Sequence, residues 1–249
     1  MTDKKIEKPV FVLIHGGWHG GWCYAETARL LRQQGYDVYA PSLTGLGDRS
    51  HLVSRTIDLS THIDDIVNLI KWEDLRNVVL CGHSYGGLVI SGVADRARDR
   101  VSLLTYLDAL LPQSGQSMHD VLPLDRAERF RSWAAERGFG WLVPPTPASI
   151  FVNRKEAIAW VDSLCVPHPL RCFEEPVRFS TDAIESLARQ YIVATDFPKS
   201  SFPAVAAALR GKPGWRVDEL HVNHDAMVDD PAGVARLLVE GYRTRQTQS

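Results

Sequence analysis

The sequence predicts an α/β fold in which a mostly parallel central sheet is flanked by helices. Short β-branched runs alternate with longer helical patterns along most of the 249 residues. Hydrophobic residues make up 45% of the chain and charged residues 23%, the balance of a folded globular protein rather than a disordered or fibrous one. An α/β sheet can absorb a chain of this length as a single unit, interrupted by one insertion.

The first part of the core is predicted to span residues 1–111. Residues 10–14 form a continuous apolar run of strand length, and Gly35 supplies a stop for the helix that follows. A later helix opens near Ser60 or Thr61 and carries its apolar residues on one face. The expected elements are, in order, strand 10–14, helix 22–34, strand 37–41, a helix from residue 60 or 61, strand 77–81, helix 86–98 and strand 101–108.

The alternation breaks down between residues 112 and 189, where prolines accumulate and aromatic residues stand among short helical patterns. This segment is predicted to be a helical cap inserted into the fold. The second part of the core then spans residues 190–249. It is expected to hold strand 190–195, a helix around 202–209, strand 215–221 and a last helix over 231–242.

Charge and composition exclude several classes of partner. The chain has 28 Lys and Arg against 30 Asp and Glu, a net charge of −2, and no basic run dense enough for a nucleic acid backbone. No apolar stretch approaches the roughly 18 to 20 residues that span a bilayer, and the first nine residues lack a signal-peptide core. A cytoplasmic protein with neither nucleic-acid nor membrane partners is expected. Its four scattered cysteines, Cys23, Cys81, Cys165 and Cys172, favour reduced thiols.

The sharpest motif is Gly82-His83-Ser84-Tyr85-Gly86, a Gly-x-Ser-x-Gly pattern between a predicted strand and a predicted helix. In that setting the serine occupies a tight, strained turn that projects its hydroxyl outward. Short matches also arise by chance in ordinary glycine-rich turns, but the strand and helix on either side favour a nucleophile. Ser84 is therefore the candidate nucleophile.

A serine hydroxyl needs a neighbouring base, and in this chain order the histidine comes last. Two histidines follow or end the final strand. His221 continues the strand pattern, which favours a local hydrogen bond. His224 falls in the loop between strand and helix, at the sheet edge where catalytic groups gather, and is the candidate base.

Two aspartates are candidates for the acid that orients the histidine. Asp108 ends a strand within an apolar stretch, where a carboxylate costs several kcal/mol unless a partner such as an imidazole N–H compensates it. Asp196 ends another strand beside Phe197 and Pro198, where a solvated loop aspartate is the ordinary explanation. Asp108 is preferred, and Asp196 stays the alternative.

A tetrahedral intermediate needs backbone N–H donors aimed at its oxyanion. Gly16-Gly17 can offer one after the first strand, and Tyr85, directly after the serine, can offer the other. A flexible glycine turn is the alternative reading of the Gly16-Gly17 segment. His15 and His19 lack carboxylate or cysteine companions at ligand spacing, so neither a metal nor a cofactor is expected.

Together these residues resemble the α/β-hydrolase fold family, and within it the branch of plant methyl esterases and hydroxynitrile lyases with their bacterial esterase relatives. The likeness covers nearly the whole chain through residues 15–22, 82–87, 191–195 and 224–227. The resemblance implies that Gly17 and Tyr85 form an oxyanion hole and that residues 112–189 are the family's helical cap. Aromatic residues there could line an apolar pocket: Phe130, Trp133, Phe139, Trp141, Phe151 and Trp160.

The chain departs from this branch in two ways. The plant enzymes carry their acid two residues beyond the threonine that matches Thr195, where this chain has Phe197. Asp108 instead matches the position used by dehalogenase relatives of the same fold. Hydroxynitrile lyases have a threonine where this chain has Gly16 and a lysine where it has Asp225, so departing cyanide would lack its cation.

The expected function is therefore hydrolysis of a small, largely apolar carboxylic ester through an acyl-enzyme. Hydroxynitrile lyase chemistry and a non-catalytic receptor on the same fold are the rivals, and a homodimer is left open. Specificity for the natural ester is expected to lie in the cap. The expected substrate contacts are Gly16, Trp18, His19, Trp133, Trp141 and Met227.

Overall fold

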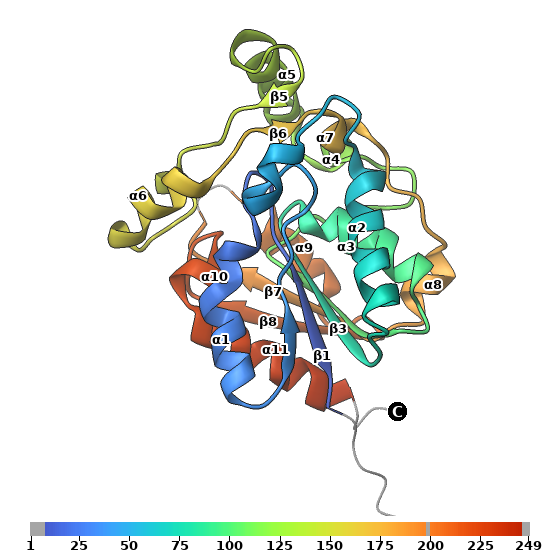
Figure 1. Ribbon diagram of the computed structural model, residues 1–249. Helices are drawn as coiled ribbons and strands as arrows, with labels where there is room; N and C mark the ends of the chain where they lie inside the picture. The colour runs from blue at the N-terminus through green and yellow to red at the C-terminus, as the bar shows by residue number, and fades with distance from the viewer. Residues whose placement is uncertain (1–7, 198–199, 246–249) are drawn as a thin grey trace, which may run out of the picture.

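Six strands form one sheet in the computed structural model, which describes residues 8–197 and 200–245 (Figure 1). Their spatial order is β2-β1-β3-β4-β7-β8, and every neighbouring pair runs parallel. The mostly parallel α/β sheet predicted from the sequence is confirmed. The strands are β1 (Val10–Ile14), β2 (Asp37–Tyr39), β3 (Val78–His83), β4 (Val101–Leu107), β7 (Arg189–Ala194) and β8 (Trp215–Leu220).

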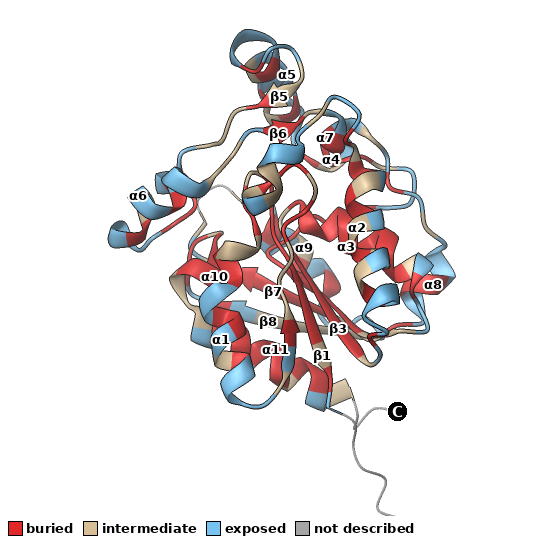
Figure 2. Cartoon of the chain, in the orientation of Figure 1, coloured by how far each residue is buried: buried red, intermediate tan, exposed pale blue. Residues whose placement is uncertain are grey.

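Helices cover both faces of this sheet. Alternate residues of a strand point to opposite faces, so in β1 Val12 packs on one side and Phe11 on the other, and both are fully buried. Figure 2 shows the central strands β1, β3, β4 and β7 buried along most of their length. The first face carries α2 (Leu59–Trp72), α3 (Gly86–Arg96) and α9 (Phe202–Leu209), and the second carries α1 (Ala25–Gln33) and α11 (Pro231–Arg245).

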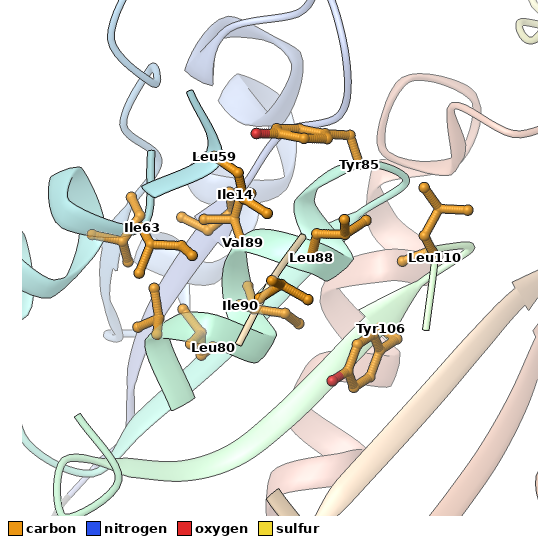
Figure 3. Close-up of a cluster of buried hydrophobic side chains, with 14 of the residues drawn as sticks. Ile14, Leu59, Ile63, Leu80, Tyr85, Leu88, Val89, Ile90, Tyr106 and Leu110 are labelled. Atoms are coloured by element: carbon orange, nitrogen blue, oxygen red, sulfur yellow. The ribbon is translucent and has the colours of Figure 1, made fainter. Parts of the chain in front are cut away.

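Helix α3 follows the candidate nucleophile and is buried along most of its length. Residues 86–94 are all buried, as expected of a helix covered on every side. Figure 3 shows Leu88 and Ile90 of this helix among the side chains of β1, β3 and α2, with Tyr85 at its start. The dense packing fixes the beginning of α3, and therefore the turn that precedes it.

Most of the chain between β4 and β7 lies over the carboxyl ends of the strands, whereas its last helix, α8 (Thr181–Glu185), lies beside the end of α3 (Figure 1). This part of the chain contains helices, as expected, and also a two-stranded antiparallel sheet. The sequence did not predict this small sheet, because strands of two residues leave no periodic pattern. Its division from the core at residues 112 and 189 stays a prediction. The elements are α4 (Met118–Val121), α5 (Leu124–Arg137), β5 (Leu142–Val143), α6 (Lys155–Leu164), β6 (His168–Pro169), α7 (Arg171–Glu174) and α8 (Thr181–Glu185).

Element boundaries differ from the sequence prediction in small ways. The helix expected over residues 22–34 begins with a 3₁₀ turn, Gly21–Tyr24, and becomes α-helical only at Ala25. The strand expected over 37–41 ends at Tyr39, two residues before Pro41, which has no N–H to donate. Two further 3₁₀ turns, Gly47–Leu52 and Ala148–Ile150, and the short helix α10 (Ala226–Asp229) complete the described elements. In the described part of the chain, no helix combines the length and the apolar character needed to cross a bilayer.

Candidate active site

The turn between β3 and α3, here called the serine turn (residues 82–86), holds Ser84 with a backbone φ of +51°. Residues other than glycine rarely adopt this left-handed backbone conformation, which costs them roughly 1–3 kcal/mol. A Cβ at Gly82 would lie 2.5 Å from the Gly86 carbonyl oxygen, and one at Gly86 would lie 2.9 Å from the Ile14 oxygen. The two glycines of the motif therefore permit a backbone approach that no other residue allows.

His224 and Asp108 meet at the carboxyl edge of the sheet. His224 lies in the loop between β8 and α10, here called the histidine loop (residues 221–225), and its Nδ1 is 2.6 Å from Asp108 Oδ2. The other Asp108 oxygen accepts the Ala194 N–H at 3.0 Å. Because Nδ1–H donates to the carboxylate, Nε2 is the nitrogen left to act as a base.

The Asp108 carboxylate is fully buried at the end of β4. Burial raises the pKa of Asp108, and the hydrogen bond and charge of His224 act in the opposite direction. Asp108 also has a left-handed backbone, with φ of +41°. The residue is therefore held in a strained conformation that aims its side chain at the imidazole.

The alternative residues lie elsewhere. Asp196 is exposed and accepts a hydrogen bond from the Thr195 hydroxyl at 3.1 Å. His221 is also exposed, and its Nδ1 lies 2.9 Å from the same hydroxyl. The structure thus brings Asp108 to His224, and gives Asp196 and His221 local surface partners.

A cavity of about 140 Å³, here called the serine cavity, has Ser84 and His224 in its wall. In the described residues no hydrogen bond joins the Ser84 hydroxyl to the His224 ring, although both face this space. Such bonds are often long before substrate binds and tighten in the Michaelis complex. The remaining wall residues are Trp18, Leu110, Met118, Leu122, Arg126, Arg129, Phe130, Trp133, Thr146, Ile150, Phe151, Phe197 and Phe202.

Two phenyl rings stack on the His224 imidazole. The Phe197 ring centroid lies 4.8 Å from that of His224 with an interplanar angle of 22°, and the Phe202 centroid lies at 5.3 Å with an angle of 7°. Phe197, which the resemblance matched to the acid position of the plant enzymes, packs against the histidine. Sequence reasoning recognised only that Phe197 cannot act as an acid.

The loop after β1, here called the glycine loop (residues 15–21), lies directly against the serine. A Cβ at Gly16 would be 3.0 Å from Ser84 Cβ and 2.8 Å from His83 Nδ1. In residues 8–197 and 200–245, neither the Gly17 nor the Tyr85 backbone N–H has a hydrogen-bond acceptor. These two N–H groups are the donors that the sequence singled out for an oxyanion hole.

The predicted substrate contacts divide into two groups. Trp18 and Trp133 line the serine cavity. Gly16 is not part of its wall, but it lies against Ser84. Three others do not reach the cavity wall: His19 bonds to Asp225, the Trp141 ring packs under Arg55 at 5.2 Å, and Met227 lines a second cavity of about 670 Å³.

The cavity wall contributed by α5 was missed, apart from its aromatic residues. Arg126 and Phe130 are four residues apart, as are Arg129 and Trp133, so one helical face reaches the cavity. That spacing was a usable signal. Among the other predicted aromatic residues, Phe151 lines the same cavity, Trp160 lines the second one, and Phe139 is 83% exposed.

One group of buried side chains has the composition of a metal site. The ligand atoms of His62, His168 and Cys172 lie within 4.8 Å of one another. Both His62 nitrogens are already 2.9 Å from hydrogen-bond partners, Tyr85 Oη and Thr44 O. Burial also raises the pKa of the Cys172 thiol well above its usual value, which disfavours the thiolate that binds metals. These residues fit a packed core better than a metal centre.

Comparison with known proteins places these features in a family. The model of the alpha/beta hydrolase family matches residues 11–237. The chain belongs to this family. The resemblance indicated by the sequence motifs is therefore confirmed.

Three relatives illustrate the family membership. A carbendazim hydrolyzing esterase from Nocardioides sp. (strain SG-4G) is 40% identical over 236 residues, which cover 92% of this chain and 97% of that protein. Methylesterase 1 of Arabidopsis thaliana is 30% identical over 124 residues, covering 49% and 47% of the two chains. The solved structure of an extracellular alpha/beta-hydrolase from a Paenibacillus species superposes with a TM-score of 0.82 at 26% identity, covering 94% and 98%.

Proposed function

We propose that this protein is a serine hydrolase that cleaves a small, largely apolar carboxylic ester through an acyl-enzyme intermediate. The observation that carries the proposal is the 2.6 Å contact between His224 and Asp108 beside a cavity that Ser84 shares. The similarity to an esterase along nearly the whole chain supports ester chemistry. The small volume and mostly apolar wall of the serine cavity support a compact, apolar substrate.

In the first half of the proposed reaction, Ser84 is acylated by the ester. Ser84 Oγ bonds to the ester carbonyl carbon while its proton passes to His224 Nε2. Asp108 stabilises the resulting imidazolium through Nδ1–H. The negative charge on the carbonyl oxygen is held by the N–H groups of Gly17 and Tyr85.

Collapse of the resulting tetrahedral intermediate breaks the ester C–O bond, and the leaving alcohol takes the proton from His224 Nε2. Water then attacks the acyl carbon and gives a proton to His224, which returns it to Ser84 as the carboxylic acid leaves. All protons are accounted for among Ser84, His224, the leaving alcohol and one water, and no atom changes its oxidation state.

The position after His224 argues against cyanohydrin cleavage. Asp225 is a fully buried carboxylate paired with His19, where the lyases of the resembled branch have a lysine. A negative side chain there cannot stabilise departing cyanide. Incubation with mandelonitrile should therefore release no benzaldehyde above the uncatalysed rate.

The deciding experiment compares wild-type protein with Ser84→Ala on p-nitrophenyl acetate. We expect Ser84→Ala to lose turnover by a factor of about 10³ or more while keeping its circular dichroism spectrum. Ser163→Ala, at an exposed serine on α6, is the matched control and should retain full activity.

A fluorophosphonate probe followed by mass spectrometry tests the same serine without a chosen substrate. The adduct should lie on the peptide containing Ser84. Unchanged hydrolysis by Ser84→Ala would remove the proposal, and a folded wild-type protein that takes no label would favour a binding role instead.

A further inference from the structure

Buried histidine rings form hydrogen bonds to successive backbone groups of the glycine loop. His15 Nε2 accepts the Leu43 N–H at 3.0 Å, so its proton is on Nδ1, which donates to the Gly16 carbonyl at 2.8 Å. His168 Nδ1 accepts the Trp18 N–H at 3.2 Å. Burial lowers the pKa of His15 to about 3 and that of His168 well below its usual value, so both rings are neutral.

The third imidazole on this loop, His19, differs because both of its nitrogens must donate. Nδ1 lies 2.8 Å from the Gly17 carbonyl, which can only accept, and Nε2 lies 2.9 Å from Asp225 Oδ2. A doubly protonated ring beside an ionised carboxylate satisfies both contacts. The Trp22 ring stacks on His19 at 5.1 Å, which suits a cation.

The directions of the pKa shifts agree with an ion pair. Burial alone would lower the pKa of His19 and raise that of Asp225. The charge and hydrogen bond of each partner outweigh burial, so the pKa of His19 is raised and that of Asp225 is lowered. Further titratable groups near the Asp225 carboxylate are His83 at the end of β3, His224 in the same loop, Asp108 at the end of β4, Cys23 beside α1 and Cys165 after α6.

Asp225 directly follows the candidate base, and a second contact ties the same loop to the serine turn. His83, which directly precedes Ser84, donates from Nε2 to the His224 carbonyl at 3.0 Å. The glycine loop, the serine turn and the histidine loop are therefore linked through buried side chains. A buried ion pair is weak evidence for stability, because the desolvation of two charges offsets their attraction. Its placement between two catalytic loops points to a different role.

We propose that His19 and Asp225 are positioning residues that join the glycine loop to the histidine loop, so that the Gly17 N–H and His224 Nε2 act on the same substrate carbonyl. This inference rests on the proposed esterase function. Oxyanion donors must lie within about 3 Å of the developing charge, and a displacement of about 1 Å can cost 10²-fold in rate. Losing the pair should therefore impair the chemical step more than substrate binding.

The kinetic test uses Asp225→Asn and His19→Gln with p-nitrophenyl acetate. Each variant should lose about 10- to 100-fold in kcat while KM stays within about threefold. The double variant should fall little further than either single variant, because both remove the same interaction. Asp230→Asn is the matched control, since Asp230 bonds to the Gly233 N–H at the start of α11 and asparagine caps helices equally well.

A spectroscopic readout separates this inference from the proposed function and from loss of fold. Nitrogen NMR of imidazole-labelled wild-type protein at pH 7.5 should show His19 protonated at both nitrogens, and Asp225→Asn should abolish that signal. If wild-type protein and Ser84→Ala are equally inactive on esters, the proposed function fails, whereas this signal still tests the ion pair.

Two results would overturn the inference. One is a neutral His19 in the wild-type spectrum. The other is full kcat in a folded Asp225→Asn that has lost the imidazolium signal. If Asp225→Asn does not fold, the kinetics of His19→Gln and the wild-type spectrum still decide the question.

Discussion

The Asp108 carboxylate lies 2.6 Å from the His224 imidazole across 116 positions of sequence, and the contact forms where β4 ends beside the histidine loop. Neither residue is near the other along the chain. The parallel sheet brings them together because all its strands deliver their carboxyl ends to one edge.

The first prediction concerns the choice between the two acids. Asp108→Asn should lower kcat on p-nitrophenyl acetate by up to about 10⁴-fold, because the histidine loses the partner that fixes its tautomer and stabilises its cation. Asp196→Asn should stay within about twofold of wild type, since Asp196 is exposed and its carboxylate accepts a hydrogen bond from its neighbour Thr195. A reversed order of the two variants would reassign the acid.

The second prediction concerns the rings stacked on His224. Replacing Phe197 by leucine removes a stacked aromatic pair worth about 0.5–1.5 kcal/mol, so kcat should fall roughly 2- to 10-fold. Phe202→Leu should act similarly. Phe139→Leu, at an exposed ring, serves as the control. Wild-type kcat in both Phe197→Leu and Phe202→Leu would mean that stacking on His224 does not contribute to catalysis.

The third prediction concerns the charge on the cavity wall. Arg126 of α5 is half-buried, lines the serine cavity, and has no side-chain partner within the described ranges. A carboxylate at the far end of the acyl chain should therefore be favoured. Arg126→Gln should lower kcat/KM for mono-p-nitrophenyl glutarate about three- to tenfold and leave p-nitrophenyl pentanoate within about twofold.

Salt provides a check on this electrostatic effect: it should shrink in 0.5 M NaCl, because salt also screens a charge that is only half-buried. Arg98→Gln, at an exposed arginine just beyond α3, should leave both substrates unaffected. Equal losses on the charged and the neutral ester would show that Arg126 shapes the wall without selecting charge.

The fourth prediction concerns the pH dependence of stability. The raised pKa of His19 means that its contribution to the free energy of unfolding is fully present below pH 6.5 and is lost as pH rises through the folded-state pKa. The lowered pKa of Asp225 means that its contribution is present above pH 3.8 and is lost as pH falls through its folded-state pKa.

The stability difference between wild type and Asp225→Asn should therefore be largest between pH 3.8 and 6.5 and decrease at higher pH. Urea denaturation at pH 5, 6, 7, 8 and 9 measures it, with Asp230→Asn as the reference variant. A difference that stays constant over this range would argue that no charged pair is present.

The sequence predicted the sheet well because its strands are short, mostly apolar runs with a glycine near their carboxyl ends, as at residues 10–14 and 78–83. It also predicted which residues follow strand ends, and so the candidate nucleophile, base and acid. The contact of His19 with Asp225 joins positions 206 apart, and no periodicity reports such a pairing. The stacking of Phe202 on His224 likewise depends on how α9 packs, which local patterns do not encode.

The left-handed backbone at Ser84 limits how robust this protein can become without losing its proposed chemistry. Glycine would adopt that conformation without strain, so relaxing the turn and keeping the hydroxyl are mutually exclusive at this one position. Any gain in thermal stability must therefore come from elsewhere in the chain, such as its exposed loops, while the backbone of the serine turn stays strained.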